Sequence, residues 1–205
     1  MLFWFIIPKT NRFIPTQKRT FALESALFCC SFDLFNIQKM HIRPATEADI
    51  STVIGLAAQI WEPTYGNILS REQLDFMFAH TYTEPFLQQQ MTDGQHFYLI
   101  FDDKNQAVGY AAWSWLTELY QNKPLAKLNK IYVLPSEQGK GTGRFLLQHI
   151  ENEVMSLSAN ALQLCVNRYN KAKNFYEKQG YRVLREEDFT FYQYFMNDFV
   201  LQKDL

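Results

Sequence analysis

From Met40 onward, apolar and polar residues recur with the periods of regular secondary structure. Apolar residues three or four positions apart predict a helix after the capping-box spacing of Thr46 and Asp49, and alternating or continuous apolar runs predict strands. The predicted helices are Asp49–Trp61, Arg71–His80, Glu84–Met91, a long one that begins near Gly141, and Asn170–Gln179. The predicted strands are His41–Arg43, His96–Phe101, Ala107–Leu116, Leu125–Leu134, Ala161–Val166, Tyr181–Arg185 and Phe191–Leu201.

The order of these elements predicts one α/β (α+β) domain with a mostly antiparallel sheet flanked by helices. The strands His96–Phe101 and Ala107–Leu116 are separated by a short polar turn, which is typical of an antiparallel hairpin. The long helix near Gly141 stands between two strands and therefore predicts a single crossover. The domain is expected to span residues 40–205.

Residues 1–39 keep no such period. They contain eight aromatic residues, and five basic residues against two acidic ones. Three interpretations remain open: an extension upstream of a domain that starts at Met40, an organellar targeting peptide, or a secretory signal. The four basic residues that precede Glu24 favour a targeting peptide, whereas no basic flank precedes the first apolar run, as a secretory signal requires. We expect the first interpretation, with residues 1–39 disordered or not part of the native protein.

The composition excludes several classes of protein. Lys plus Arg number 20 and Asp plus Glu 21, so binding to nucleic acid by general neutralisation of phosphates is not expected. No apolar run approaches the roughly 20 residues of a transmembrane helix, so no membrane partner is expected. Two of the three cysteines, Cys29 and Cys30, are adjacent, which is a poor start for a disulfide framework, and the histidines match no metal-ligand spacing. These features indicate a cytoplasmic globular protein without a bound metal.

Three alternating glycines mark the segment with the clearest chemistry. Gly139, Gly141 and Gly143 stand between a predicted strand and a predicted helix, with Lys140 and Arg144 beside them. Glycine lets the backbone approach a ligand, and the unpaired N–H groups at a helix start attract anions. The segment therefore predicts a phosphate or pyrophosphate site. Its spacing fits neither a P-loop nor the Gly-x-Gly-x-x-Gly dinucleotide motif.

Residues 40–205 resemble the GNAT superfamily of acyl-CoA-dependent N-acetyltransferases. Gln138, Gly141 and Gly143 match the family's Gln/Arg-x-x-Gly-x-Gly/Ala motif, and the segment Asn170–Tyr181 is similar to its Asn…Ala…Phe-Tyr-Glu-Lys-x-Gly-Phe motif. The surrounding Lys-Leu-x-Lys-Ile-Tyr-Val-Leu-Pro and Val-Asn-Arg sequences look most like the bacterial diamine and polyamine acetyltransferase branch. The resemblance implies the GNAT fold for residues 40–205 and acetyl-CoA as co-substrate, and it does not cover residues 1–39.

The resemblance also implies which main-chain groups hold the donor. Those that would hold the pyrophosphate of CoA are the amides of Gln138, Gly139, Lys140, Gly141, Thr142, Gly143 and Arg144. Those that would pair with the pantetheine arm, as an added strand does, belong to Ile131, Tyr132 and Val133. One of the latter N–H groups would polarise the thioester carbonyl.

Side chains receive roles on the same basis. Tyr176 is implied as the general acid for the leaving thiolate, with a core aromatic residue as the alternative interpretation. Asn170 is implied as a ligand of the pantetheine arm or as the cap of the short helix, and Asn167 is a second candidate. Cys165 lies within a predicted strand and is expected in the core, so no covalent intermediate is proposed.

The base and the acceptor side stay open. Some members of the family place a Glu where this chain has Asn129, whose amide cannot accept a proton. Glu118 and Asp188 are candidate bases, but the expectation for each is a solvated surface acid, and no base is assigned. By the resemblance, the helical region after the first strand lines the acceptor side. Its aromatic and acidic residues would suit a polycation, or are ordinary exposed helix residues: Trp61, Tyr65, Glu62, Glu72, Asp75 and Glu84.

The sequence therefore predicts an enzyme that transfers acetyl from acetyl-CoA directly to a primary amine of a small molecule, with a polyamine as candidate. Two alternatives remain: acetylation of a protein N-terminus or lysine, and a CoA-binding sensor without catalysis. The expected partners are acetyl-CoA and the amine, without nucleic acid or membrane. Homodimers are common in the family, so a homodimer is an oligomeric state to test.

Overall fold

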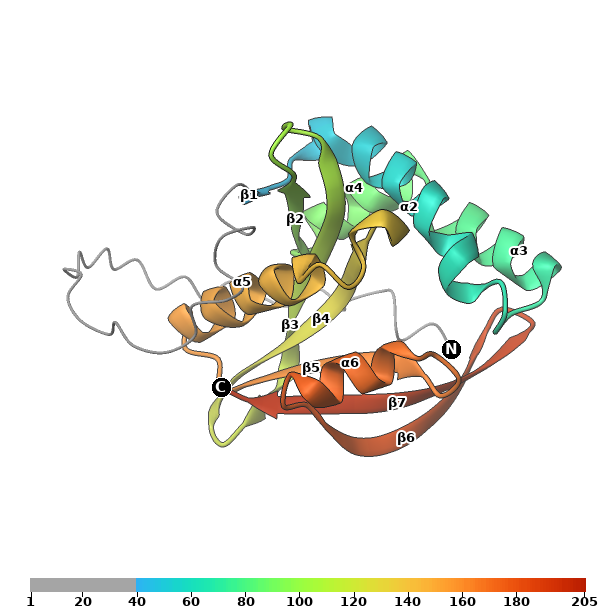
Figure 1. Ribbon diagram of the computed structural model, residues 1–205. Helices are drawn as coiled ribbons and strands as arrows, with labels where there is room; N and C mark the ends of the chain where they lie inside the picture. Colours follow the sequence, from blue (N-terminus) through green and yellow to red (C-terminus); the bar gives the residue numbers. More distant parts are fainter. Residues whose placement is uncertain (1–39) are drawn as a thin grey trace.

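A seven-stranded sheet forms the centre of residues 40–205, the part of the chain that the structure, a computed structural model, describes (Figure 1). Its strands are β1 (His41–Pro44), β2 (His96–Phe101), β3 (Ala107–Tyr120), β4 (Lys123–Val133), β5 (Ala161–Asn167), β6 (Arg182–Phe191) and β7 (Tyr194–Asp204). They lie in the order β1-β2-β3-β4-β5-β7-β6, and every described neighbouring pair is antiparallel except β4 and β5. The predicted mostly antiparallel sheet with one crossover is confirmed.

Helices cover both faces of this sheet (Figure 1). Helices α5 (Thr142–Ser156) and α6 (Ala172–Lys178) lie on one face, and α2 (Ile50–Tyr65), α3 (Arg71–Thr81) and α4 (Glu84–Thr92) lie on the other. Each face has its own apolar core, the first around Ile150 of α5 and the second around Val53 of α2. Two short 3-10 helices, η1 (Glu47–Asp49) and η2 (Pro135–Glu137), precede α2 and α5. No helix within residues 40–205 has the length and apolar character to cross a bilayer.

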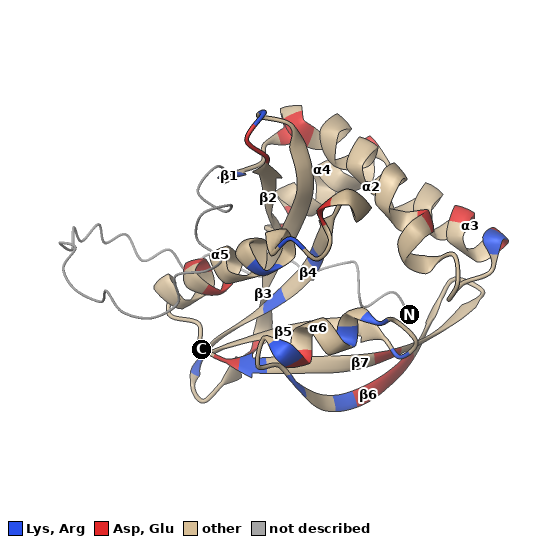
Figure 2. Cartoon of the chain, viewed as in Figure 1, with Lys and Arg blue, Asp and Glu red and all other residues tan. Residues whose placement is uncertain are grey.

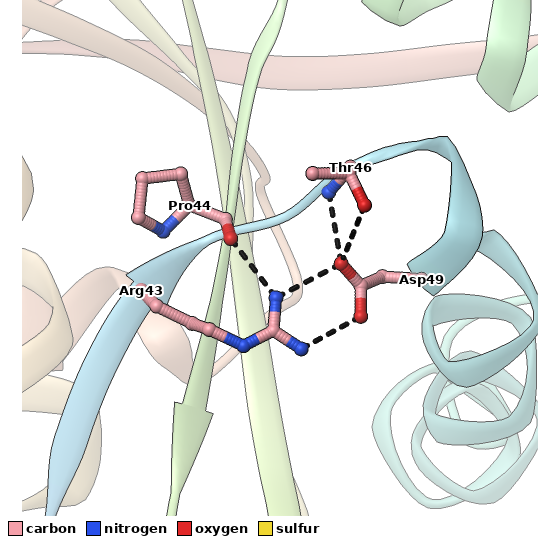
Figure 3. A network of polar contacts seen from close by, with 4 residues as sticks. All are labelled: Arg43, Pro44, Thr46 and Asp49. Carbon is pink, nitrogen blue, oxygen red and sulfur yellow. Dashed lines mark hydrogen bonds and ion pairs between the residues drawn. The ribbon is translucent and has the colours of Figure 1, made fainter.

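A polar network at the start of α2 confirms the predicted capping box (Figure 3). The carboxylate of Asp49 accepts hydrogen bonds from the backbone N–H of Thr46 at 2.9 Å and from its hydroxyl at 3.1 Å. Arg43, on β1, donates to both oxygens of the same carboxylate, at 2.9 and 2.7 Å. The hydrogen bonding from Arg43 is the largest cause that holds the pKa of Asp49 well below its ordinary value. The network therefore ties β1 to the start of the first long helix.

The predicted boundary between the last two strands is wrong. β6 reaches Phe191 and β7 begins at Tyr194, so the turn lies at Tyr192, whose φ is 54°. Neither glycine nor asparagine marks this turn, and the acidic stretch Glu186–Asp188 interrupts the apolar alternation that the prediction used. β6 is an edge strand with mostly exposed side chains, where charged residues are tolerated. The resulting hairpin extends beyond β5, so its far end packs against α3 through Phe76 and Tyr192.

Candidate active site

β4 and β5 pair over only part of their length. Their register joins Leu125–Leu128 to Ala161–Leu164, whereas β4 continues to Val133 and β5 to Asn167. The diverging ends open onto a cavity of about 940 Å³. Its walls come from β4, β5, the turn before α5, α6, the β6–β7 hairpin, and the end of α2 with the loop after it. The cavity therefore reaches from one face of the sheet through the gap to the other.

The register of β3 and β4 shows which main-chain groups face the gap. The N–H of Leu134 donates to the Val108 carbonyl at 2.9 Å, and hydrogen-bonded and non-bonded pairs alternate in an antiparallel ladder. Tyr132, two residues before Leu134 and opposite Tyr110, therefore directs its main-chain groups to β3. Those of Ile131 and Val133 face the gap. The predicted strand edge is thus open at Ile131 and Val133, while the main chain of Tyr132 is used within the sheet.

The glycine turn lies where α5 begins, on the wall of the cavity. Gly139 and Gly141 have φ values of 78° and 90°, a backbone conformation that favours glycine. The first intrahelical bond is donated by the N–H of Phe145 to the Gly141 carbonyl, at 2.9 Å. Amides before Phe145 have no acceptor inside the helix, and the helix dipole is positive there, which suits an anion. These amides are those of Gly141, Thr142, Gly143 and Arg144.

Other members of the predicted turn hold it together. The amides of Gln138 and Lys140 donate to the carbonyls of Pro135 and Glu137, at 3.2 and 3.4 Å. Glu137 also accepts from the Lys140 ammonium at 3.0 Å and from the buried hydroxyl of Thr142 at 3.1 Å. The residues of the turn that line the cavity are Gln138, Gly139, Gly141, Gly143 and Arg144. Basic residues also occur on α6 and in the loop before it (Figure 2), and Lys171 of this loop lines the same cavity.

Tyr176 reaches the cavity from α6. It is 9% exposed, and no described residue forms a hydrogen bond with its hydroxyl. Its ring packs against Phe175 and Tyr181, with centroids 5.2 and 5.9 Å apart, so it contributes to the core as well. Burial raises the pKa of the Tyr176 hydroxyl well above its ordinary value, which keeps the hydroxyl protonated at neutral pH. The residue can therefore pack as a core aromatic and still present a proton to a ligand.

Four asparagines line the cavity, and three of them, Asn129, Asn167 and Asn170, have structural hydrogen bonds. Asn170 accepts from the Ala172 N–H at 2.9 Å just before α6, whose N-terminal cap residue is Lys171 rather than Asn170. Asn167 accepts from the Tyr169 N–H at 3.0 Å and donates to the Asn197 side chain at 3.0 Å. Asn129 donates to the Ser114 hydroxyl at 2.8 Å. Both the oxygen and the NH2 group of the Asn167 side chain thus form hydrogen bonds, whereas only the oxygen of Asn170 does.

The helical region after β1 contributes aromatic residues to the cavity, and its acids lie elsewhere. Trp61 and Tyr65 line the cavity, and the Tyr65 hydroxyl lies 2.8 Å from that of Tyr132. Arg71 binds two of the acids on the surface of α2 and α3, at 2.5 and 2.8 Å. The acids considered from the sequence that do not line the cavity are Glu62, Glu72, Asp75, Glu84, Glu118 and Asp188. Asp188 instead forms an ion pair with Arg168.

The structure brings charged residues to the cavity that the sequence analysis did not consider, among them Lys127, Lys130, Glu137 and Asp198. Asp198 of β7 and Lys127 of β4 both line the cavity. Burial raises the pKa of Asp198 to about 6. A signal existed in the sequence, because Asp198 interrupts the period-two apolar positions Met196 and Val200, both of which are buried.

Two other kinds of chemistry find no support in this part of the fold. Burial raises the pKa of the Cys165 thiol, which disfavours the nucleophilic thiolate. Cys165 is partly buried and lines the cavity, so the structure does not place it wholly in the core as expected. Residues 40–205 contain no group of three or more His, Cys, Asp or Glu side chains arranged to hold a metal ion.

Comparison with known proteins places this geometry in a family. Residues 68–193 match the family model described as "Acetyltransferase (GNAT) domain". The chain is 28% identical over 165 residues to the uncharacterized N-acetyltransferase YhfO of Bacillus subtilis (strain 168), covering 77% of this chain and 97% of that protein. It is 26% identical over 149 residues to the spermidine N(1)-acetyltransferase of Thermoplasma acidophilum, covering 70% of this chain and 89% of that protein.

Among solved structures, the PaiA N-acetyltransferase of Thermoplasma acidophilum in complex with coenzyme A is similar with a TM-score of 0.66. It shares 25% identity, and the match covers 81% of this chain and 99% of that one. The match therefore covers a share of the chain close to that of the described residues, 40–205.

Proposed function

The chain belongs to the GNAT acetyltransferase family and is an N-acetyltransferase that uses acetyl-CoA. On this premise we propose that its acceptor is a primary amine of a small molecule. Diamines and polyamines are the first class of acceptor to test. One observation carries the proposal: a single cavity joins an anion-binding turn, an open strand edge and a protonated, buried tyrosine. A thioester carrier with a diphosphate, an amide-bearing arm and a leaving thiolate needs these three features, in this order.

In this proposal the donor lies along the gap. The diphosphate binds the amides at the start of α5, from Gly141 to Arg144, with Gly139 leaving the approach open. The pantetheine amides pair with the main chain of Ile131 and Val133, because an extended arm can add to a strand edge as another strand would. The side-chain NH2 of Asn170 is available to the same arm, since its oxygen already accepts from the Ala172 N–H.

The transfer is direct and uses two protons. The acceptor ammonium first loses one proton, and its nitrogen then attacks the thioester carbonyl, forming the C–N bond and moving the carbonyl π pair onto oxygen. An N–H of Ile131 or Val133 stabilises this oxyanion. When the oxyanion collapses, the C–S bond breaks with its electron pair on sulfur, and Tyr176 donates its proton there. The second proton lost by nitrogen restores the Tyr176 hydroxyl, so acetylamine and CoA thiol are the products.

Three facts support a small cationic amine as the acceptor. A relative at 26% identity is a spermidine N(1)-acetyltransferase, and the PaiA enzyme shares the fold at 25% identity. Trp61 and Tyr65 add aromatic faces to the cavity lining, and aromatic faces attract ammonium groups. The carboxylate of Asp198 lines the same cavity.

A thiol-release assay with acetyl-CoA and a panel of acceptors tests the proposal. The panel contains aliphatic diamines, spermidine, spermine, simple monoamines, and peptides with free N-termini or lysines. We expect release of CoA thiol with diamines or polyamines, and little with peptides. Turnover of peptides alone would replace the proposal by protein acetylation. Binding of CoA without turnover of any acceptor would indicate a sensor.

Replacing Tyr176 by Phe tests the proton donor. We expect kcat to fall by about 100-fold, the lower end of what a general acid contributes. The affinity for acetyl-CoA, measured by calorimetry, should stay within about twofold, because no described residue is bonded to this hydroxyl and the ring remains. Tyr181→Phe is the matched control: its hydroxyl donates to Glu151 at 3.0 Å away from the cavity, so it should affect stability and spare kcat. An unchanged kcat in Tyr176→Phe would remove the proposed role.

A further inference from the structure

The half-buried Asp198 differs from Glu151, the fully buried acid of the described residues. Glu151, which is 2% exposed, accepts from the Tyr181 hydroxyl at 3.0 Å and from the Lys203 ammonium at 2.7 Å, so both of its oxygens are satisfied. In contrast, the Oδ1 atom of Asp198 is buried and forms no hydrogen bond within the described residues. A buried carboxylate oxygen without a partner is costly, so it calls for an explanation. Because Asp198 lines the active-site cavity, a ligand can supply the missing partner.

Charged and titratable groups surround Asp198 from each neighbouring strand. β6 brings Glu187 directly opposite it, β5 brings Asn167 opposite it on the other side, and both strands pair with β7. Burial is the largest cause that raises its pKa, and Glu187 raises it further, whereas Lys127 of β4, Arg168 after β5 and a side-chain hydrogen bond from Asn167 lower it. The thiol of Cys165 on β5 also interacts with this carboxylate. Arg168 is shared with other acids, because it also forms ion pairs with Glu186 and Asp188.

The carboxylate also lies near the reacting centre. Burial is the main cause that raises the pKa of Tyr132 well above its ordinary value, and the charges of Tyr65, Tyr176 and Asp198 raise it further. Burial similarly raises the pKa of Tyr65, with added contributions from Tyr176 and Asp198. The side chains of Tyr65, Tyr132, Tyr176 and Asp198 all line the same cavity.

We propose that Asp198 binds the ammonium group of the acceptor through its unpartnered oxygen and takes the proton that this group must lose before attack. The assignment rests on the proposed amine acetylation and supplies the base that Asn129 cannot be. In the step, an N–H bond of the ammonium breaks, its electron pair stays on nitrogen as the attacking lone pair, and the proton bonds to Asp198 Oδ1. The proton then leaves to solvent, while the second proton of nitrogen follows the path through Tyr176.

The dependence of kcat/KM on pH tests this role in the unaltered protein. If the ammonium form binds the ionised carboxylate, kcat/KM with an aliphatic diamine is flat between about pH 6 and the pKa of the amine, near 10. If the enzyme must wait for neutral amine from solution, kcat/KM instead rises tenfold per pH unit through that range. We expect the flat profile. A tenfold rise per unit in the unaltered protein overturns the assignment.

Asp198→Asn provides the second arm. The amide cannot take the proton, so we expect kcat/KM at pH 7 to fall by about 100-fold and the profile to change to the tenfold rise per unit. The difference in kcat/KM between Asp198→Asn and the unaltered protein then becomes smaller as pH rises toward the pKa of the amine. A purely structural role would lower the profile without changing its slope, and a variant with the profile of the unaltered protein would equally overturn the proposal. Glu118→Gln, an acid on β3 outside the cavity, is the matched control and should leave the profile unchanged.

The proposed function and the proposed role of Asp198 are refuted by different results. If no amine on the panel is acetylated, the proposed function fails and the role of Asp198 falls with it. If amines are acetylated with a profile that rises through neutral pH, the proposed function stands and only the role of Asp198 is overturned. O-methylhydroxylamine is weakly basic and therefore neutral at pH 7. With this acceptor, the difference in kcat/KM between the unaltered protein and Asp198→Asn should be smaller than with a diamine. If Asp198→Asn loses as much kcat/KM with this acceptor as with a diamine, Asp198 does not act by taking a proton from the acceptor.

Discussion

Gly109 of β3 lies where a side chain would press on the strand that borders the gap. An added Cβ atom would come within 2.6 Å of the Tyr132 carbonyl oxygen, 2.9 Å of Val133 Cγ1 and 3.0 Å of Ile100 Cγ2. The first of these contacts is with main chain, which a rotamer change cannot relieve. Gly109→Ala must therefore move β3 and β4 apart at the residues that face the donor.

The size of the effect follows from this contact. Ordinary carbon–oxygen contacts between strands are about 3.3 Å long, so relieving one of 2.6 Å requires a displacement of about 0.7 Å. Overpacking of this kind costs about 1–3 kcal/mol of unfolding free energy. The same displacement shifts the main chain of Ile131 and Val133, and a misplacement of about 1 Å can lower turnover by about 100-fold. We expect a loss of about 2 kcal/mol and at least a tenfold lower kcat.

Urea unfolding and the thiol-release assay measure the two effects separately. Gly55→Ala is the control, because nothing lies within 4 Å of a Cβ atom at this position in α2. Alanine should stabilise the helix by about 0.5–1 kcal/mol and leave kcat unchanged. If Gly109→Ala unfolds at the same urea concentration as the unaltered protein and keeps kcat within about twofold, the geometric argument is refuted.

Three further predictions concern stability. The raised pKa of Asp198, about 6, means that its ionisation opposes folding as pH rises from about 4 through 6, so Asp198→Asn should be more stable by about 2 kcal/mol at pH 8 and equal at pH 3. Lys203→Met leaves Glu151 buried without its cation, and thermal unfolding at pH 7 should show a loss of about 3 kcal/mol. The lowered pKa of Asp49 stabilises the fold above about pH 4, and this contribution is lost as pH falls further, so Asp49→Asn should cost about 1 kcal/mol at pH 7 and progressively less in acid denaturation below about pH 4. A difference in stability that does not change with pH would contradict the arguments for Asp198 and Asp49. A Lys203→Met variant as stable as the unaltered protein at pH 7 would contradict the argument for Glu151.

Local signals in the sequence predicted most elements and the donor side of the site. The Thr46–Asp49 spacing identified the start of the first long helix, because a capping box involves only neighbouring residues. The glycines before α5 indicated an anion site for the same reason, since φ values of 78° and 90° at Gly139 and Gly141 are requirements of the local backbone. Where local signals were weak, as at the turn with Tyr192, the predicted boundary was wrong.

The acceptor side depended on contacts between distant segments. Asp198, Lys127 and Tyr65 belong to β7, β4 and α2, and no spacing in the chain links them. They meet because β5 and β7 pair from Ala161 to Asn167 while β4 leaves β5 after Leu128.

The amino-acid sequence by itself thus determined the periodicity of the elements, the fold class and the anion-binding turn, since each depends on a few consecutive residues. Only the tertiary structure decided that Ile131 and Val133 face the gap, that the helix acids lie outside it, and that Asp198 lies inside with an unpartnered oxygen. The physical reason is that burial and strand divergence depend on how the whole sheet packs, and they set which backbone edges stay open and which carboxylate is desolvated.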